Sequence, residues 1–157
     1  MRRGAGHALL VLVLCAGCFG GGAAPETVEP APQLSDQEIT AFSQRIEGFY
    51  STLEDVPLDA LVTYENKKLR DCFATQGGFS DYFSALATEA RNLSFRDSTA
   101  RSVRIREFHF DARDEASVFV TFTSVNQREI RFWSIHFDRH DTWKLTDGVW
   151  LIVPEKL

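Results

Sequence analysis

Two histidine–aspartate pairs are the residues of this sequence that could most readily do chemistry. The tripeptide His-Phe-Asp occurs at residues 109–111 and again at 136–138. Side chains of an extended chain alternate between faces, so the histidine and the aspartate of each pair share one face. Such a pair could act as a general base. If the two runs are the first and third strands of a meander, both pairs lie on one rim about 10 Å apart, at the limit for sharing one metal ion.

A structural interpretation of the same pairs competes with the chemical one. Each aspartate can begin a turn through its side chain, and each histidine can be a half-exposed strand residue. Neither pair has a third close metal ligand, and the sequence contains no phosphate loop, nucleophile elbow or zinc-spaced cysteine set. We therefore predict no metal, no cofactor and no catalytic residue. The candidates for a pocket or a rim are Tyr50, His109, Asp111, Trp133, His136 and Asp138.

Cys15 and Cys18 have the spacing of a redox pair but lie in a different context. They follow Arg2, Arg3 and the apolar run ALLVLVL at residues 8–14, which is the layout of an export signal. That run is too short for a membrane-spanning helix, which needs about 20 residues. A redox pair also needs a folded scaffold that lowers the pKa of one thiol. The two cysteines are therefore interpreted as part of an export signal rather than as a redox pair.

The segment resembles a bacterial lipoprotein signal, in which small residues precede a cysteine that is lipidated after cleavage. Ala16-Gly17-Cys18 matches that pattern, although Cys15 stands where leucine is usual. The resemblance implies a signal peptide over residues 1–17, a lipid on Cys18 and a flexible tether over residues 18–34, which are rich in Gly, Ala and Pro. The alternative is a plain secretory signal with an incidental Cys18.

The same resemblance favours the outer membrane of the cell envelope, because Phe19 rather than aspartate follows the cysteine. Residues 35–157 are then one globular domain, for which a chain of 157 residues with 44% hydrophobic residues is sufficient. The formal net charge of −5 disfavours nucleic acid as a partner. Cys72, the one cysteine of this domain, is expected to be a small buried residue, with intermolecular pairing as the alternative.

The first half of the domain has a helical apolar period. A capping box at Ser35–Glu38 begins an amphipathic helix that extends to about residue 54. A short second helix follows Pro57, and residues 65–75 fit either a helical continuation or a short strand. A third helix is predicted behind Gly77-Gly78, with Ser80 as its N-cap.

After residue 100 the apolar period changes to alternation. We predict an antiparallel meander of four strands at residues 102–110, 116–125, 130–138 and 142–146, with RHD (139–141) as the last turn. Asp147-Gly148 then turns the chain into a final apolar stretch at 149–153. Helices followed by an antiparallel sheet constitute an α+β fold.

The third predicted strand is apolar on both faces. Ile130 and Phe132 share a face with His136, and Trp133, Ile135 and Phe137 take the other. A sheet with helices on one side normally exposes a polar outer face. We therefore predict that the outer face is covered, either in a homodimer or by another envelope protein, and the alternative is an ordinary exposed aromatic surface.

The order of these elements resembles the nuclear transport factor 2-like (SnoaL-like) superfamily, in which a curved sheet wraps a cone of three helices. The resemblance rests on the aromatic pair Phe49-Tyr50, the segment PLDAL (57–61) and the closing WKLTDG (143–148). Residues 65–78 depart from it, because they are few for the hairpin usual there. It implies three helices packed on a curved antiparallel sheet. We predict a non-catalytic binding or assembly module, and the alternative is a small hydrolase or isomerase with a histidine base in the cone.

Overall fold

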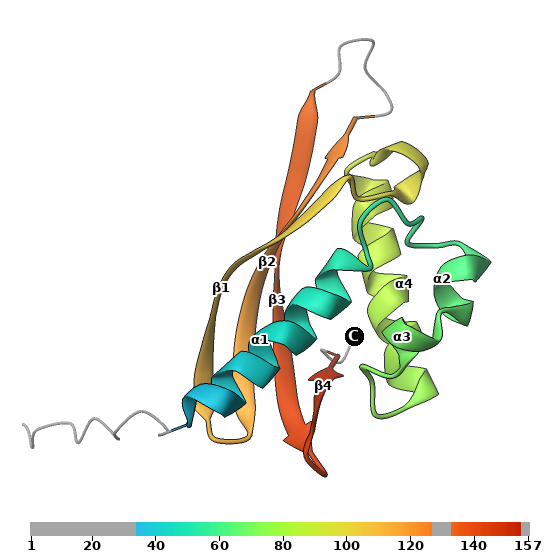
Figure 1. Cartoon of the computed structure of the whole chain (residues 1–157). Helices are drawn as coiled ribbons and strands as arrows, with labels where there is room; N and C mark the ends of the chain where they lie inside the picture. The colour runs from blue at the N-terminus through green and yellow to red at the C-terminus, as the bar shows by residue number, and fades with distance from the viewer. Residues whose placement is uncertain (1–33, 127–132, 155–157) are drawn as a thin grey trace, which may run out of the picture.

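The computed structural model describes residues 34–126 and 133–154 (Figure 1). Helix α1, Asp36–Ser51, begins at the predicted capping box. The Ser35 hydroxyl accepts the backbone N–H of Glu38, and the Glu38 carboxylate accepts the backbone N–H of Ser35 at 2.8 Å. These two bonds satisfy donors that have no partner inside the helix, which fixes where α1 begins.

The segment between α1 and the sheet contains further helices joined by turns, and the structure corrects one boundary. Helix α2, Leu61–Glu65, is the predicted short helix after Pro57, and helix α3, Lys67–Arg70, lies in the region 65–75 that the sequence left open between helix and strand. Helix α4, Gln76–Asn92, begins before the predicted cap Ser80. Its N-cap is Thr75, whose hydroxyl accepts the backbone N–H of Gly78 at 3.0 Å. Because Thr75 caps the helix, the two glycines lie inside its first turn rather than before it.

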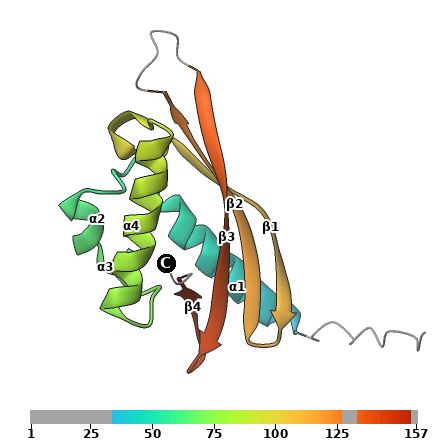
Figure 2. The ribbon, with the colours of Figure 1, turned by 180° about the vertical axis from the view of Figure 1, so that it is seen from behind.

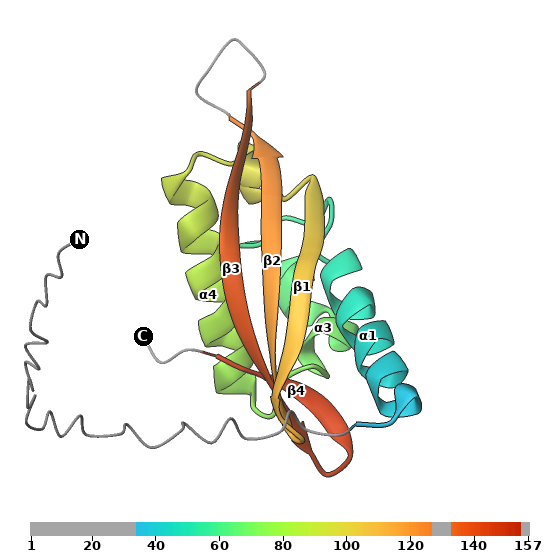
Figure 3. The ribbon, with the colours of Figure 1, turned by 90° about the vertical axis from the view of Figure 1, so that its left-hand side faces the viewer.

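The sheet is an antiparallel meander in the order β1-β2-β3-β4. Its strands are β1, Ser102–Ala112, β2, Glu115–Val125, β3, Ser134–Thr146, and β4, Val149–Val153. A short 3₁₀ helix, Arg96–Ser98, precedes β1. The helices lie together on one face of the curved sheet, α1 beside β1 and α4 beside β3 (Figures 1, 2 and 3). The predicted α+β fold, with N-terminal helices packed on a curved antiparallel sheet, is confirmed.

One predicted turn within the sheet is wrong. Residues 139–141 continue β3, so the third and fourth predicted strands are a single strand. Strand β2 is long enough to pair with β3 from Val125↔Ser134 to Glu115↔Lys144, which keeps these polar residues extended. The predicted Asp147-Gly148 turn is present, with φ angles of 51° and 78° that suit the turn of a two-residue hairpin. It leads into β4, the predicted final apolar stretch.

The outer face of the sheet is more polar than the sequence suggested. Along the described part of β3, the residues that alternate with its buried side chains are Ser134, His136, Asp138, His140, Thr142 and Lys144. Phe137 points inward and is buried. The prediction of an apolar outer face on this strand is therefore wrong for these residues, while Ile130 and Phe132 lie outside the described ranges.

The interior between the helices and the sheet is filled by aromatic and aliphatic side chains. Phe42 of α1 contacts Phe108 and Phe110 of β1 as well as Trp143 and Trp150, with ring centroids 4.7–6.1 Å apart. Cys72 is buried here, as predicted. None of the helices in residues 34–126 and 133–154 is long and apolar enough to cross a membrane.

Candidate functional site

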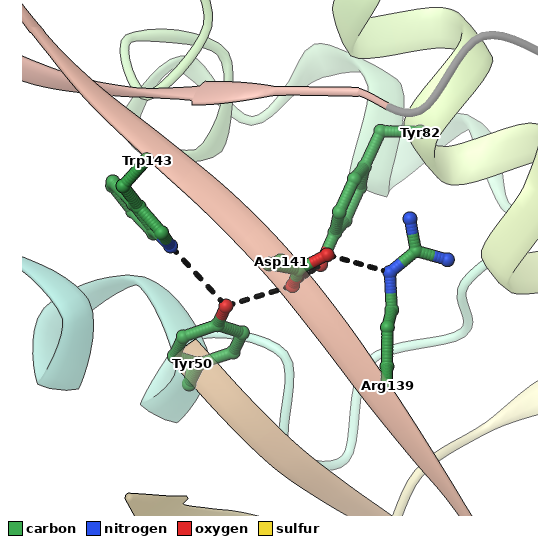
Figure 4. A network of polar contacts seen from close by, with 5 residues as sticks. All are labelled: Tyr50, Tyr82, Arg139, Asp141 and Trp143. Atoms are coloured by element: carbon green, nitrogen blue, oxygen red, sulfur yellow. Dashed lines mark hydrogen bonds and ion pairs between the residues drawn. The ribbon is translucent and has the colours of Figure 1, made fainter. Parts of the chain in front are cut away.

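A cluster of polar side chains lies inside this apolar interior, where helices and sheet meet (Figure 4). Asp141 is at its centre, on the inner face of β3 and only 3% exposed. The Arg139 and Trp143 side chains flank it on the same face, because residues two apart in a strand point the same way. Tyr50 near the end of α1 and Tyr82 in the middle of α4 reach it from the helices.

Both carboxylate oxygens of Asp141 are bonded. The Tyr50 and Tyr82 hydroxyls donate to Oδ2 at 2.7 and 2.8 Å, and Arg139 Nε donates to Oδ1 at 2.7 Å. The Trp143 indole N–H donates to the Tyr50 oxygen at 3.4 Å. The Arg139 guanidinium also lies over the Tyr82 ring, 4.4 Å from its centroid, which is cation–π geometry. The cluster therefore links α1, α4 and β3 through one buried carboxylate.

The surroundings hold both tyrosines in their neutral form. Burial raises the pKa of Tyr50 and Tyr82 well above the usual value, and the nearby charge of Asp141 raises it further. Burial alone would lower the pKa of Arg139, but Tyr82 and Asp141 outweigh it, so the pKa is raised. The cluster thus holds one ion pair whose carboxylate receives two neutral hydroxyl donors.

This arrangement is closed rather than poised for reaction. Among the described residues, every buried side-chain nitrogen or oxygen has a hydrogen-bond partner. Tyr50, Tyr82 and Trp143 are at most 1% exposed. A general base needs a free lone pair within reach of a substrate proton, whereas the Asp141 oxygens are already occupied and screened from solvent. The chemistry that this cluster supports is structural cross-linking.

Tyr50 is the one sequence-predicted candidate that belongs to this cluster. Asp141 and Arg139 were assigned to a turn, and Tyr82 lay in the third predicted helix without an assigned role. The signal that could have found them is the alternation of inward positions along β3, which runs without a break through Phe137, Arg139, Asp141 and Trp143. The apparent turn RHD hid this continuity.

The two His-Phe-Asp pairs lie on the opposite, outer face of the sheet. His109 Nε2 is 3.0 Å from Asp111 Oδ1, so the first pair interacts as expected from its spacing. The prediction that both pairs share one rim is wrong. His109 lies opposite Ser117 of β2 and His136 opposite Thr123, six residues further along the strand. That offset is about 20 Å at the usual strand rise, too far for one metal ion.

Both pairs lie near Phe119 on that face. The Phe119 ring stacks between His109 and His140, with centroids 5.6 and 4.7 Å apart. His136 and Asp138 line a hollow of about 350 Å³, together with Arg106, Phe119, Val120 and Thr121. In residues 34–126 and 133–154, no three His, Cys, Asp or Glu side chains are grouped so as to hold a metal ion.

Trp133 and Cys18 are the remaining candidates, and Trp133 belongs to neither cluster. Trp133 lies just before β3 and is 57% exposed, with its backbone oxygen accepting the N–H of Asn126 at 3.1 Å. Cys18 falls outside the described residues, so its lipidation stays a prediction.

Removing the outer-face histidines is expected to have little effect. We predict that His109→Ala and His136→Ala, singly or together, leave thermal stability and bound zinc unchanged, because exposed pairs contribute at most about 1 kcal/mol. Differential scanning fluorimetry with and without zinc, and metal analysis of the purified protein, measure both quantities. A zinc-dependent rise of several degrees that the double variant loses would contradict the prediction.

Comparisons with known proteins return only distant similarities. No family model matches the chain, and no curated protein matches it. It is similar to a solved structure from Xanthomonas campestris described as a calcium/calmodulin-dependent protein kinase II association domain, with a TM-score of 0.39 and 15% identity over 78% of this chain and 85% of that one.

A second solved structure, from Campylobacter jejuni, is described as an NTF2-like transpeptidase. Here the TM-score is 0.35 and the identity 12%, over 77% of this chain and all of that one. Both TM-scores and both identities are low, so the fold stands on the elements of this chain itself.

Proposed function

We propose that the chain is a lipid-anchored protein of the cell envelope, whose domain, of nuclear transport factor 2-like shape, is a non-catalytic binding or assembly module. The supporting observation is the filled interior. Phe42, Phe79, Phe83, Leu86 and Trp143 are fully buried between the helices and the sheet. A pocket enzyme needs space for substrate beside its reacting groups, whereas this interior is occupied by packed rings and by the closed Asp141 cluster.

The alternative, a small hydrolase or isomerase with a histidine base in the cone, gains no support from where the histidines lie. His109, His136 and His140 are exposed on the outer face of the sheet, on the side away from the helices. That surface suits contact with a partner better than a sequestered reaction, because it is open to solvent.

Membrane attachment is tested by removing the cysteine that would carry the lipid. We expect Cys18→Ser to abolish fatty-acid labelling, and either to release the protein from the membrane fraction or to leave its signal uncleaved. Several acyl chains on one cysteine make a lasting anchor, since each buried methylene contributes about 0.8 kcal/mol. Metabolic labelling with a fatty-acid analogue, followed by fractionation, measures the effect.

The matched control is Cys15→Leu, which restores the residue usual at that position of a lipoprotein signal. It should keep labelling and localisation unchanged. Labelling of Cys18→Ser at the unaltered level would refute a lipid on Cys18. Loss of labelling in Cys15→Leu alone would show that Cys15 carries the lipid instead.

Self-association through the exposed Trp133 is the simplest assembly role for the domain. We expect the mature full chain in detergent to associate reversibly, and Trp133→Glu to weaken that association without unfolding the domain, because the Trp133 side chain just before β3 is largely exposed. Sedimentation over a concentration series, with circular dichroism as the folding control, provides the test. If the protein is a monomer at every concentration, the homodimer is refuted and the partner would be a different envelope protein.

A further inference from the structure

A groove on the helical side of the domain combines open space with unneutralised positive charge. It lies between α1 and α3, has a volume of about 470 Å³, and is separate from the Asp141 cluster. Helix α1 lines one wall, and Lys68, Asp71 and Cys72 line the other. The volume is within the usual range for small-molecule sites in proteins, about 300–1,000 Å³.

Two cations line this groove without a carboxylate partner among the described residues. The Arg45 side chain bridges two backbone oxygens, with Nη2 donating to the Asp71 carbonyl at 2.6 Å and Nε to the Trp150 carbonyl at 3.4 Å. These bonds hold the guanidinium in place while its Nη1 donors remain unused within the described chain. Lys68 extends no side-chain bond to any described residue. Among the residues that line the groove, Asp71 carries the one negative charge.

A glycine keeps the groove open. Gly48 lies in the interior of α1, where glycine lowers helix stability by about 1 kcal/mol relative to alanine. A Cβ built at Gly48 would meet no atom within 4 Å, so close packing does not demand a glycine there. Its backbone φ is an ordinary helical one, so no turn demands it either. Gly48 therefore leaves open space in the wall of the groove that α1 forms.

We infer that the α1–α3 groove is a binding site for a small organic acid, whose carboxylate is held by Arg45 and Lys68 and whose carbon skeleton lies over Gly48. Charge-assisted hydrogen bonds to guanidinium and ammonium groups are the strong ones in proteins. Arg45 is already oriented by its two carbonyl contacts, so little side-chain entropy is lost when an anion binds. The buried Phe49 and Cys72 supply an apolar floor for the skeleton.

The ligand class follows from the size and charge of the groove. Two cations and one nearby carboxylate favour a ligand with one or two negative charges. The groove lies along the second half of α1 and beside the end of α3 rather than at the N-terminus of a long helix, which is the backbone arrangement that favours phosphate. This inference concerns a site different from the outer face and does not depend on the lipid anchor.

Titration calorimetry on the full chain in detergent tests the inference, with succinate, citrate and inorganic phosphate as probes. We expect at least one carboxylate probe to bind, and added sodium chloride to weaken its binding. Lys68→Gln should weaken binding about tenfold, which corresponds to about 1.4 kcal/mol. Gly48→Leu should abolish binding while leaving Tm unchanged or higher, because leucine is the better helix former and fills the open space.

Gly77→Leu is the matched control, since Gly77 lies in the first turn of α4, outside the groove, and a Cβ there would also have room. It should leave binding unchanged. If Gly48→Leu lowers Tm, then Lys68→Gln decides alone. Binding that survives both groove variants, binding of phosphate only, or no binding of any probe would overturn the inference.

Discussion

Replacing Asp141 with alanine is expected to lower the free energy of unfolding by about 3–5 kcal/mol, a large part of the stability of a typical domain. The substitution leaves the Arg139 guanidinium, whose side chain is 14% exposed, without its counter-charge. It also removes the acceptor of two buried hydroxyls, those of Tyr50 and Tyr82. An unpaired buried charge and unsatisfied donors are both costly, because neither regains its bonds to water.

Urea unfolding followed by tryptophan fluorescence measures this loss, and Asp138→Ala is its control on the same strand. Asp138 lies on the exposed outer face and, among the described residues, accepts a hydrogen bond only from the Thr121 hydroxyl. Its removal should cost less than about 1 kcal/mol. If the two alanine variants lost similar stability, Asp141 would not be the residue that joins the helices to the sheet.

Features decided by neighbouring residues could be read from the sequence. The capping box at Ser35–Glu38 and the Asp147-Gly148 turn depend on groups within a few positions of one another, and both are present as predicted. The apolar periods likewise predicted the helix behind the capping box and the strand at 116–125, which are present as α1 and β2, since apolar spacing follows the geometry of regular elements. Together these local signals were enough for the α+β class.

Features decided by pairing partners could not be read in the same way. The triplet at 139–141 is strongly polar and reads as a turn, but the length of β2 on one side keeps it in the sheet. Because residues 139–141 continue the strand, His136 lies near the beginning of β3 rather than at a strand end. The two histidine pairs therefore lie at opposite ends of the sheet. Strand register is a tertiary property, because it depends on what the neighbouring strand offers.

The buried cluster shows the same limit more sharply. Tyr50 and Asp141 are 91 positions apart in the chain, and Tyr82 and Asp141 are 59 apart. No local pattern links residues at such separations. What the sequence does hold is an aspartate at an inward strand position, which requires buried donors somewhere in the fold. That requirement is a usable signal, provided the strand is recognised as continuous.

The second large effect is expected in alkali. We predict that the free energy of unfolding falls by about 2.7 kcal/mol per pH unit once the pH exceeds about 10, where tyrosines of the unfolded chain ionise. Below that pH both states keep their phenolic protons, so these two tyrosines add no pH dependence to stability. Above it the unfolded chain releases two protons that folded Tyr50 and Tyr82 retain, because burial and the adjacent Asp141 raise their pKa. Raising the pH therefore favours unfolding.

Urea titrations between about pH 9 and pH 11 measure this slope, and the protein offers its own controls. Cys72→Ala serves as the background, because burial also raises the pKa of the Cys72 thiol and would add to the slope. In that background Tyr82→Phe should halve the dependence, since one of the two retained protons is gone. Tyr64→Phe should leave it unchanged, because Tyr64 packs on Phe79 and Phe83 away from Asp141. The prediction would be contradicted if the free energy of unfolding of the Cys72→Ala protein did not change with pH, or if both phenylalanine variants reduced the slope equally. Either result would mean that Tyr50 and Tyr82 do not keep their protons in the folded domain at alkaline pH.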